Sequence, residues 1–301
     1  MLPGTINRVS DVRAAPGGKS AHVAMVLKTL GENPRWLGFS GGVTGAQLLQ
    51  GLSALGIATQ PVRVDQDTRV NLEILDECGG ITEILEPGLA IPDTEWKSFF
   101  KLCDKLFSES APATIVASGS LPSGADLGCY ARLTDLAHQR GHKMFLDCGG
   151  EALRLGLAAR PDFVKPNREE AEILLGEAIP DSRAALRAAN KLIDMGAKSA
   201  VVSLGQSGFV WQSTADHPAY HVHPPRVAVK SSVGCGDATV AAFAHGVAAG
   251  LTVKDTLQLA AACGAANCLA DLPGQLRDTD VKAFLGQVRV EELPKSYGLP
   301  E

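Results

Sequence analysis

SSVGCGDATVAAFAHG, residues 231–246, places two glycines around a single residue directly before a run of small, helix-compatible residues. Gly234 and Gly236 permit a tight turn that exposes successive backbone N–H groups, and the positive end of the following helix reinforces them. Such a turn can bind an anion, with Asp237 placed to accept a proton from a hydroxyl. The same pattern is equally typical of a loop and a helix capped by an Asp, so both interpretations stay open at this point.

The bulk composition describes a large globular chain and excludes several classes of partner. With 301 residues, of which 45% are apolar, the chain can bury one large core, and we expect a single domain over residues 1–301. The net charge of −5, the aromatic content of 5% and the absence of a block of Lys and Arg argue against nucleic acid.

The chain also lacks the marks of a membrane or secreted protein. No apolar run reaches the ~18 residues that span a bilayer, and residues 1–13 contain no apolar core of a secretory signal. The cysteines are seven in number, scattered and without a CxxC pair. This usage fits free thiols in a reducing compartment, so we expect a cytoplasmic protein with no membrane partner.

Strands and helices alternate through most of the chain. The predicted strands are residues 114–118, 144–147, 163–165, 200–204 and 209–211. The predicted helices are residues 21–30, 45–55, 95–108, 128–140, 169–175, 183–195, 238–249, 253–270 and 280–287. Apolar strands between amphipathic helices predict an α/β fold, a three-layer α/β/α core with a mostly parallel sheet. Ligands of such sheets bind at the carboxyl ends of the strands.

Residues 62–85 interrupt this rhythm with a β-hairpin pattern. VNLEILDECGGITEIL, residues 70–85, contains two alternating runs joined by a Gly-Gly turn, with polar residues on one face. Residues 5–15 carry Ile6, Val9 and Val12 among polar residues and predict one or two further strands. We therefore expect a small β lid formed by about residues 1–15 and 60–90.

Two further stretches carry polar residues at strand ends. In VKPNREEAEILLG, residues 164–176, Asn167 and Glu170 either form a capping box at a helix start or hold a hydrated Mg²⁺. In SLGQSGFVW, residues 203–211, Gly205 and Gly208 permit a tight turn, which is either a plain hairpin turn or a seat for a ligand.

Three other positions suit a substrate with hydroxyls and a phosphate. APGGKSAHVA, residues 15–24, brings Lys19 to a helix start, and ASGSLPSG, residues 117–124, brings Ser120 to a strand end. Arg69 lies in the predicted lid, where a guanidinium could bind a phosphate through two hydrogen bonds. An ordinary turn and an exposed strand arginine remain alternatives for these positions.

The order and spacing of these motifs resemble the PfkB (ribokinase-like) carbohydrate kinases over nearly the whole chain. GGKSAHVAMVLKTLG, residues 17–31, is similar to the N-terminal signature of the family, and residues 231–246 are similar to its C-terminal one. KPNREE, residues 165–170, matches its Asn-x-x-Glu element. SGSLPSG, TRVN and VKPN are shared especially with the branch that contains 1-phosphofructokinase, tagatose-6-phosphate kinase and the minor 6-phosphofructokinase.

The resemblance implies ATP and Mg²⁺ as cofactors and assigns roles by matched position. Asp237 would be the catalytic base, and the anion hole would be built from Gly234, Cys235 and Gly236. The residues implied to lie along ATP are Lys165, Asn167, Ser203, Leu204, Gly205, Gln206, Ser207 and Gly208. Asn167 and Glu170 would hold Mg²⁺ through water. The residues implied to face the sugar phosphate are Gly18, Lys19, His22, Arg69 and Ser120.

Several positions depart from the family pattern. The family opens with a core strand that ends in an Asp-containing segment, and we expect this strand to be absent here. Ser20 stands where the family has Gly, and His22 stands where it has a substrate-binding Asn. Cys235 replaces an Ala at a helix N-terminus, which predicts a lowered thiol pKa and inhibition by alkylation.

The resulting prediction is ATP-dependent phosphorylation of fructose 1-phosphate, tagatose 6-phosphate or fructose 6-phosphate, by a homodimer that pairs through the lid. Two alternatives stay open: a kinase of an unphosphorylated sugar or nucleoside, and an inactive nucleotide- or sugar-binding protein. A separate candidate is HPAYHVHPP, residues 217–225, where His221 and His223 share one face of a strand. They could bind a metal, although an exposed edge strand explains them as well.

Overall fold

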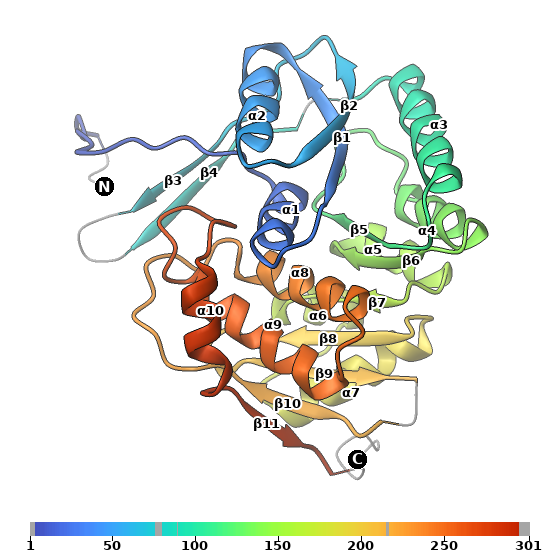
Figure 1. Cartoon of the computed structure of the whole chain (residues 1–301), viewed down its shortest axis with the longest axis vertical. Coiled ribbons are helices and arrows are strands. Elements are labelled where there is room, and N and C mark those ends of the chain that lie inside the picture. The colour runs from blue at the N-terminus through green and yellow to red at the C-terminus, as the bar shows by residue number, and fades with distance from the viewer. Residues whose placement is uncertain (1–3, 76–79, 89, 215–216, 295–301) are drawn as a thin grey trace.

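Helices cover both faces of a seven-stranded sheet in the computed structural model, which describes residues 4–75, 80–88, 90–214 and 217–294 (Figure 1). The strands, in their order across the sheet, are β11 (Arg289–Glu292), β10 (Tyr220–His223), β9 (Phe209–Ser213), β8 (Ser199–Ser203), β7 (Phe163–Val164), β6 (Lys143–Asp147) and β5 (Thr114–Ser118). Neighbours from β5 to β8 are parallel, whereas the pairs β8/β9, β9/β10 and β10/β11 are antiparallel. β10 therefore runs in the direction of β5–β8, and the mostly parallel sheet is confirmed.

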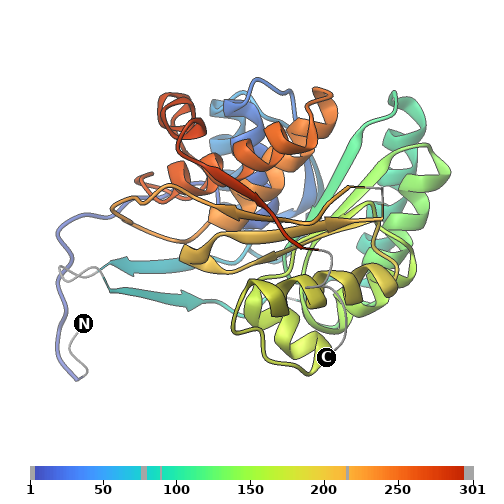
Figure 2. The same ribbon diagram turned by 90° about the horizontal axis from the view of Figure 1, so that it is seen from below.

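The helices form two outer layers, which confirms the three-layer prediction (Figure 2). One face carries α1 (Lys19–Thr29), α8 (Cys235–Ala248), α9 (Val253–Asn267) and α10 (Asp278–Leu285). The other carries α3 (Asp93–Glu109), α4 (Cys129–Gln139), α5 (Gly150–Ala158), α6 (Arg168–Leu175) and α7 (Ser182–Asp194). Each layer buries its own apolar core against the sheet, around Leu146 and Leu153 on one side and Val222 and Phe243 on the other. None of the described helices is long and apolar enough to cross a bilayer.

A second parallel pair of strands was not predicted. β1 (Arg35–Gly41), α2 (Gly42–Ala54) and β2 (Ala58–Val64) form a β-α-β unit that packs on α1 through Trp36 and Leu52. Glycines at 38 and 41 interrupt the apolar pattern of β1, and a proline at 61 interrupts that of β2. Residues 62–64, which we expected in the lid hairpin, belong to this unit instead.

The predicted hairpin is present as an antiparallel pair, β3 (Asn71–Leu75) with β4 (Ile81–Leu85). Residues 76–79, which include part of the Gly-Gly turn, lie outside the described residues. The strand predicted within residues 5–15 is wrong, because residues 5–15 contain no strand and pair with none of the described strands. This segment leaves the body on the same side as the hairpin (Figures 1 and 2).

Several element ends also differ from the sequence prediction. β10 is not an edge strand, because β11 pairs with its outer side and the Tyr220 and Val222 side chains are buried. α8 begins at Cys235 rather than at residue 238, so the glycine turn continues directly into the helix. α5, which begins at Gly150 with Gly149 as its N-cap, was not predicted at all.

Candidate active site

The carboxyl ends of the parallel strands meet the first turns of α1 and α8 and bring polar side chains together, as expected for this class of sheet. The residues that these elements place there are Ser118 at the end of β5, Asp147 at the end of β6, Lys165 after β7, Ser203 at the end of β8, Lys19 and His22 on α1, and Asp237 on α8.

Asp237 lies in the first turn of α8 and is buried. The Nδ1–H of His22 donates a hydrogen bond of 2.8 Å to the Asp237 Oδ2. His22 is also buried. Gly274, in the segment after α9, packs closely against the His22 Cα and Cβ and so holds α1 against this segment. His22, which we expected to contact substrate, therefore contacts the proposed base, and Oδ1 is the carboxylate oxygen that faces away from this bond.

The turn before α8 has the conformation that its two glycines allow. Gly234 is the N-cap of the helix with φ of 80°, in the left-handed region that disfavours residues with a Cβ. A Cβ at Gly236 would lie 2.9 Å from the Lys165 Nζ, so the glycine lets the ammonium group approach the turn. The Cys235 N–H donates to the Ser232 carbonyl at 3.3 Å, whereas the N–H groups of Gly234 and Gly236 meet no protein acceptor among the described residues. Two of the three expected anion-hole donors are thus free to bind a ligand.

A buried charge network lies beside this turn. The Lys165 Nζ is 3.2 Å from the Asp147 Oδ1, and Asp147 and Lys165 are only 0% and 4% exposed. Ser118 donates to the Asp147 Oδ2 at 3.1 Å, and the Lys19 Nζ is 3.7 Å from the same oxygen. Burial opposes ionisation of Asp147, but the two lysines outweigh it and hold the pKa of this carboxyl below its ordinary value.

Asp147 was missed by the sequence analysis, although it ends a predicted apolar strand at the ligand-binding edge of the sheet. Its charge fixes the positions of both lysines. Burial lowers the pKa of Lys19, but the carboxylates of Asp147 and Glu170 outweigh it, so the pKa stays above its ordinary value. Lys19 therefore remains an ammonium group at this edge of the sheet.

Asn167 and Glu170 form the capping box at the start of α6. The Glu170 N–H donates to the Asn167 Oδ1 at 2.8 Å, and the Asn167 N–H donates to the Glu170 Oε2 at 2.9 Å. The Glu170 Oε1 has no hydrogen-bond donor in the cap and lies 3.7 Å from the Lys19 Nζ. A carboxylate oxygen of this kind can accept hydrogen bonds from the waters of a hydrated Mg²⁺, which keeps several of its waters when it binds to proteins.

The Ser203–Gly208 segment lies next to this cap. Ser203 forms a parallel bridge with Asn167, and the Ser203 N–H donates to the Pro166 carbonyl at 3.2 Å. Leu204 and Gly208 close the turn through a hydrogen bond of 2.7 Å, around the short 3₁₀ helix Gly205–Ser207 that includes Gln206. Lys165, Asn167 and this turn therefore follow one another along the strand ends, while no direct contact within the described residues joins the turn to Asp237.

The residues that we predicted to face the sugar phosphate are brought together only in part. The Arg69 Nη2 lies 3.4 Å from the Ser120 Oγ and donates to it, and both side chains are exposed. Gly18 is the N-cap of α1, and Lys19 extends from the first helical position toward Gly119, the neighbour of Ser120. No direct contact within the described residues joins Arg69 to Lys19, so a bound molecule would have to bridge them.

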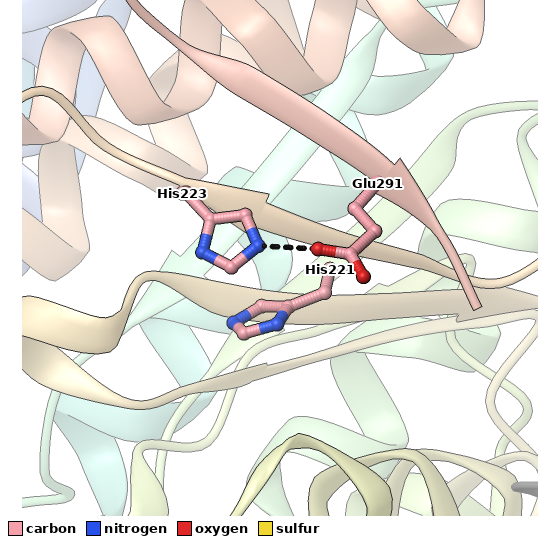
Figure 3. Close-up of side chains that lie close together, drawn as sticks. All are labelled: His221, His223 and Glu291. Carbon is pink, nitrogen blue, oxygen red and sulfur yellow. Dashed lines mark hydrogen bonds and ion pairs between the residues drawn. The ribbon is translucent and has the colours of Figure 1, made fainter.

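An arginine of β11 contacts the histidine cluster of β10. His221, His223 and Glu291 offer ligand atoms that all lie within 4.8 Å of one another, and Figure 3 shows them on one face of β10 and β11. The Arg289 Nη2 lies 2.8 Å from the His223 Nε2, and its Nη1 lies 2.8 Å from the Glu291 Oε2. The His221 Nε2–H donates to the Ser207 carbonyl at 2.8 Å. Because a guanidinium already supplies the positive charge here, we assign no metal to this cluster.

Cys235 does not behave as expected for a thiol at a helix N-terminus. Its Sγ lies 3.1 Å from the Cys268 Sγ. The hydrogen bond that Cys235 donates to Cys268 and the burial of the group raise the pKa of Cys235 instead of lowering it. The same hydrogen bond lowers the pKa of Cys268.

A buried carboxylate, free backbone N–H groups and two ammonium groups at the strand ends define the site of a phosphotransferase, which moves a phosphoryl group to a hydroxyl. Comparison of the sequence with known families agrees with this class. The model of the pfkB family carbohydrate kinases matches residues 2–276, and the chain belongs to this family. As a member of this family, the chain is a phosphotransferase of the carbohydrate kinase class.

The relatives cover most of the chain. It is 30% identical over 278 residues to the 1-phosphofructokinase of Borreliella burgdorferi, spanning 92% of this chain and 88% of the relative. It is 33% identical over 258 residues to that of Rhodobacter capsulatus, spanning 85% and 81%. Among solved structures, phosphofructokinase-2 from Escherichia coli in complex with substrates and products superposes with a TM-score of 0.86 at 28% identity, covering 95% of this chain and 92% of that one.

Proposed function

We propose that this chain transfers the γ-phosphoryl group of ATP to a hydroxyl of a ketohexose phosphate, with Asp237 as the base. The candidate acceptors are fructose 1-phosphate, tagatose 6-phosphate and fructose 6-phosphate. The observation that carries the proposal is that the buried Asp237 directly follows the glycine turn, which the Lys165 ammonium approaches and whose N–H groups at Gly234 and Gly236 meet no protein acceptor among the described residues. The printed names of the relatives support the phosphosugar class.

The first task of the site is to move a proton. In our proposal the acceptor hydroxyl lies against the Asp237 Oδ1, because His22 already binds Oδ2. Asp237 takes the proton as the hydroxyl oxygen attacks the γ-phosphorus in line, and the bond from that phosphorus to the bridging oxygen of ADP breaks. The N–H groups of Gly234 and Gly236 donate to the phosphoryl oxygens as their charge spreads in the transition state.

The second task is to hold ATP with its phosphates toward the glycine turn. In this arrangement the Lys165 ammonium neutralises phosphate charge at the glycine turn, and Asn167 with residues 203–208 lies along the nucleotide. Mg²⁺, bound through water to Asn167 and Glu170, would neutralise part of the charge on the ATP phosphates. The paired carboxylate of Asp147 keeps Lys165 and Lys19 in place when no ligand is bound.

The third task is to select the acceptor. Lys19 lies next to Gly119 and Arg69 donates to Ser120, so a phosphate on the sugar would connect the two cations. This arrangement favours a phosphosugar over an unphosphorylated sugar or a nucleoside. The proposed base, the glycine turn and both lysines are present, which disfavours an inactive binding protein. Ser20, one of the departures from the family pattern, accepts a hydrogen bond from the Trp36 indole at 3.1 Å.

We further propose that the β3–β4 hairpin is the lid of a single domain and pairs with the lid of a second copy. Leu72 and Ile84 lie directly opposite each other in the hairpin and are 53% and 46% exposed. Glu73 is on the other face of the hairpin, opposite Glu83, and burial and the charge of Glu83 raise its pKa. Because a two-stranded sheet is only marginally stable in water, a second lid on the apolar face would stabilise it.

The proposal is tested by sugar-dependent release of ADP from Mg-ATP. The panel holds the three ketohexose phosphates named above, with fructose, ribose and a nucleoside as unphosphorylated acceptors, and the matched control is Asp237→Asn. We expect turnover with one phosphosugar that falls at least 10³-fold in the control while ATP affinity is retained. Preferred turnover of an unphosphorylated acceptor, or none at all despite ATP binding, would contradict the proposal and favour one of the alternatives.

A further inference from the structure

The helical hairpin of α8 and α9 brings two cysteines that are far apart in the sequence to one end of the pair. Cys235 is the first residue of α8, and Cys268 is the C-cap of α9. Their Sγ atoms are 3.1 Å apart, and both residues are partly exposed. A disulfide has an S–S distance of about 2.05 Å, so closure by about 1 Å would join them.

The remaining described cysteines lack this reactivity. They are buried, and burial raises the pKa of each to about 12; they are Cys103, Cys129, Cys148 and Cys263. At Cys268 the hydrogen bond from Cys235 has the opposite effect and lowers the thiol pKa. In the proposal that follows, Cys268 acts as the thiolate nucleophile of the pair and Cys235 as the thiol that resolves it.

The cysteine pair belongs to the structure that positions the glycine turn. Asn267 is buried, donates to the Val233 carbonyl at 2.7 Å and accepts from the Gly274 N–H at 2.8 Å. The same amide nitrogen lies 3.4 Å from the Cys235 Sγ. A covalent bond between Cys235 and Cys268 would move the first residue of α8 within this network, and with it the free N–H groups of Gly234 and Gly236.

We propose that Cys235 and Cys268 are an oxidation site for peroxides, where a reversible disulfide displaces the glycine turn and slows phosphoryl transfer. The effect on transfer rests on the proposed function, whereas formation of the disulfide does not. Loss of a single anion-hole donor costs about 10²–10³ in turnover in other enzymes, so a shifted turn lowers turnover by at least about tenfold.

The chemistry consumes one hydrogen peroxide for each disulfide. The Cys268 thiolate attacks one peroxide oxygen, the O–O bond breaks, and the released hydroxide takes a proton to become water while Cys268 becomes a sulfenic acid. The Cys235 sulfur then attacks the sulfenic sulfur, the S–S bond forms, and the leaving hydroxide takes the Cys235 proton as a second water. Two thiols lose two electrons, and one peroxide is reduced to two waters.

The test uses the full chain, treated with a small excess of hydrogen peroxide, alkylated and digested with trypsin without reductant. Cleavage after Lys230, Lys254 and Arg277 places Cys235 in residues 231–254 and Cys268 in residues 255–277. The second peptide also contains Cys263, so Cys263→Ala is the matched control and Cys268→Ser is the test variant. We expect the linked peptides in the wild type and in Cys263→Ala, and their absence in Cys268→Ser.

The activity measurement completes the test. Oxidised wild type should lose at least tenfold in turnover and regain it with dithiothreitol, whereas Cys268→Ser should keep its turnover through the same treatment. Linked peptides that persist in Cys268→Ser, no linked peptides in the wild type, or a linked wild type with full turnover would overturn the proposal. If the reduced chain turns over no sugar, the peptides still decide the disulfide, and the change in affinity for Mg-ATP replaces turnover.

Discussion

The imidazole Nδ1 of His22 lies 2.8 Å from the carboxylate Oδ2 of Asp237, although 215 residues separate them in the sequence. The contact exists because α1 packs directly on α8, so the helix that begins the described core supports the helix that carries the proposed base. The histidine therefore links α1 to the carboxylate that we propose as the base.

Replacement of His22 tests whether this bond orients Asp237. His22→Ala leaves the buried Oδ2 without its donor, and we expect kcat to fall about 10–100-fold and the free energy of unfolding to fall by about 1–3 kcal/mol. His22→Asn keeps a hydrogen-bond donor at this position and should retain more of both. Steady-state kinetics and urea unfolding measure the two effects. An unchanged kcat in His22→Ala would show that the bond does not position the base.

Asp147→Asn tests the buried network. The substitution leaves the Lys165 ammonium buried without a counter-charge, and breaking a buried pair in this way costs about 3–5 kcal/mol. The matched control is Asp104→Asn, which breaks an exposed pair with Arg140 and should cost less than about 1 kcal/mol. Equal losses in the two variants, measured by urea unfolding, would contradict the importance of the network.

The pH dependence of the same variant gives an independent check. Because the folded-state pKa of Asp147 is lowered, its contribution to stability is complete above the unfolded-state pKa of about 4. The contribution is lost as the pH falls through the lower, folded-state pKa. The difference in unfolding free energy between wild type and Asp147→Asn should therefore be constant from pH 7 to about pH 5 and shrink below about pH 4. A difference that grows in acid would have the wrong sign.

Gly236→Ala tests the approach of Lys165 to the glycine turn. The added Cβ would lie 2.9 Å from the Lys165 Nζ, so the ammonium group must move away from the phosphate that we place there. We expect at least a tenfold loss of kcat with an unfolding free energy within about 1 kcal/mol of wild type, since the lysine end is flexible. Gly286→Ala, where a Cβ meets nothing within 4 Å, is the control and should leave kcat unchanged.

Charges on the lid test the proposed dimer. Leu72→Lys with Ile84→Lys places two ammonium groups on the exposed apolar face of the hairpin and should convert a dimer to a monomer. Light scattering after gel filtration measures the molar mass. Replacing Gln50 by Lys, an exposed polar position of α2 outside the hairpin, serves as the control. A wild-type chain that is monomeric at every concentration would contradict the proposal that the chain dimerises through the lid.

The sequence was sufficient wherever a local pattern determines the structure. The glycine turn before α8, the Asn167–Glu170 capping box and the β3–β4 hairpin each depend on residues within a few positions of one another. The alternation of strands and helices likewise predicted the three layers. These features are set by backbone freedom, capping and periodicity, which a single sequence displays directly.

Other features depend on contacts between distant segments and could not be predicted. Nothing local to His22 indicates that it binds Asp237, and nothing local to Cys268 indicates that it meets Cys235. Asp147 gains its role from Lys165, which follows the neighbouring strand, and from Lys19 on α1. The parallel pair of β1 and β2 was not predicted because glycines interrupt the apolar pattern of β1 and a proline interrupts that of β2. Packing on α1 stabilises both strands.

The central claim, that the acceptor is a phosphosugar, is tested most directly by Arg69→Ala. Arg69 donates to Ser120 and is placed to bind the acceptor phosphate, and a charged hydrogen bond of this kind contributes about 1.5–3 kcal/mol. We predict that KM for the ketohexose phosphate rises about 10–100-fold while KM for ATP is unchanged, and that Arg63→Ala, an exposed arginine of β2, has no effect. An unchanged KM in Arg69→Ala, or equal turnover of the phosphosugar and its unphosphorylated parent in the wild type, would contradict the account.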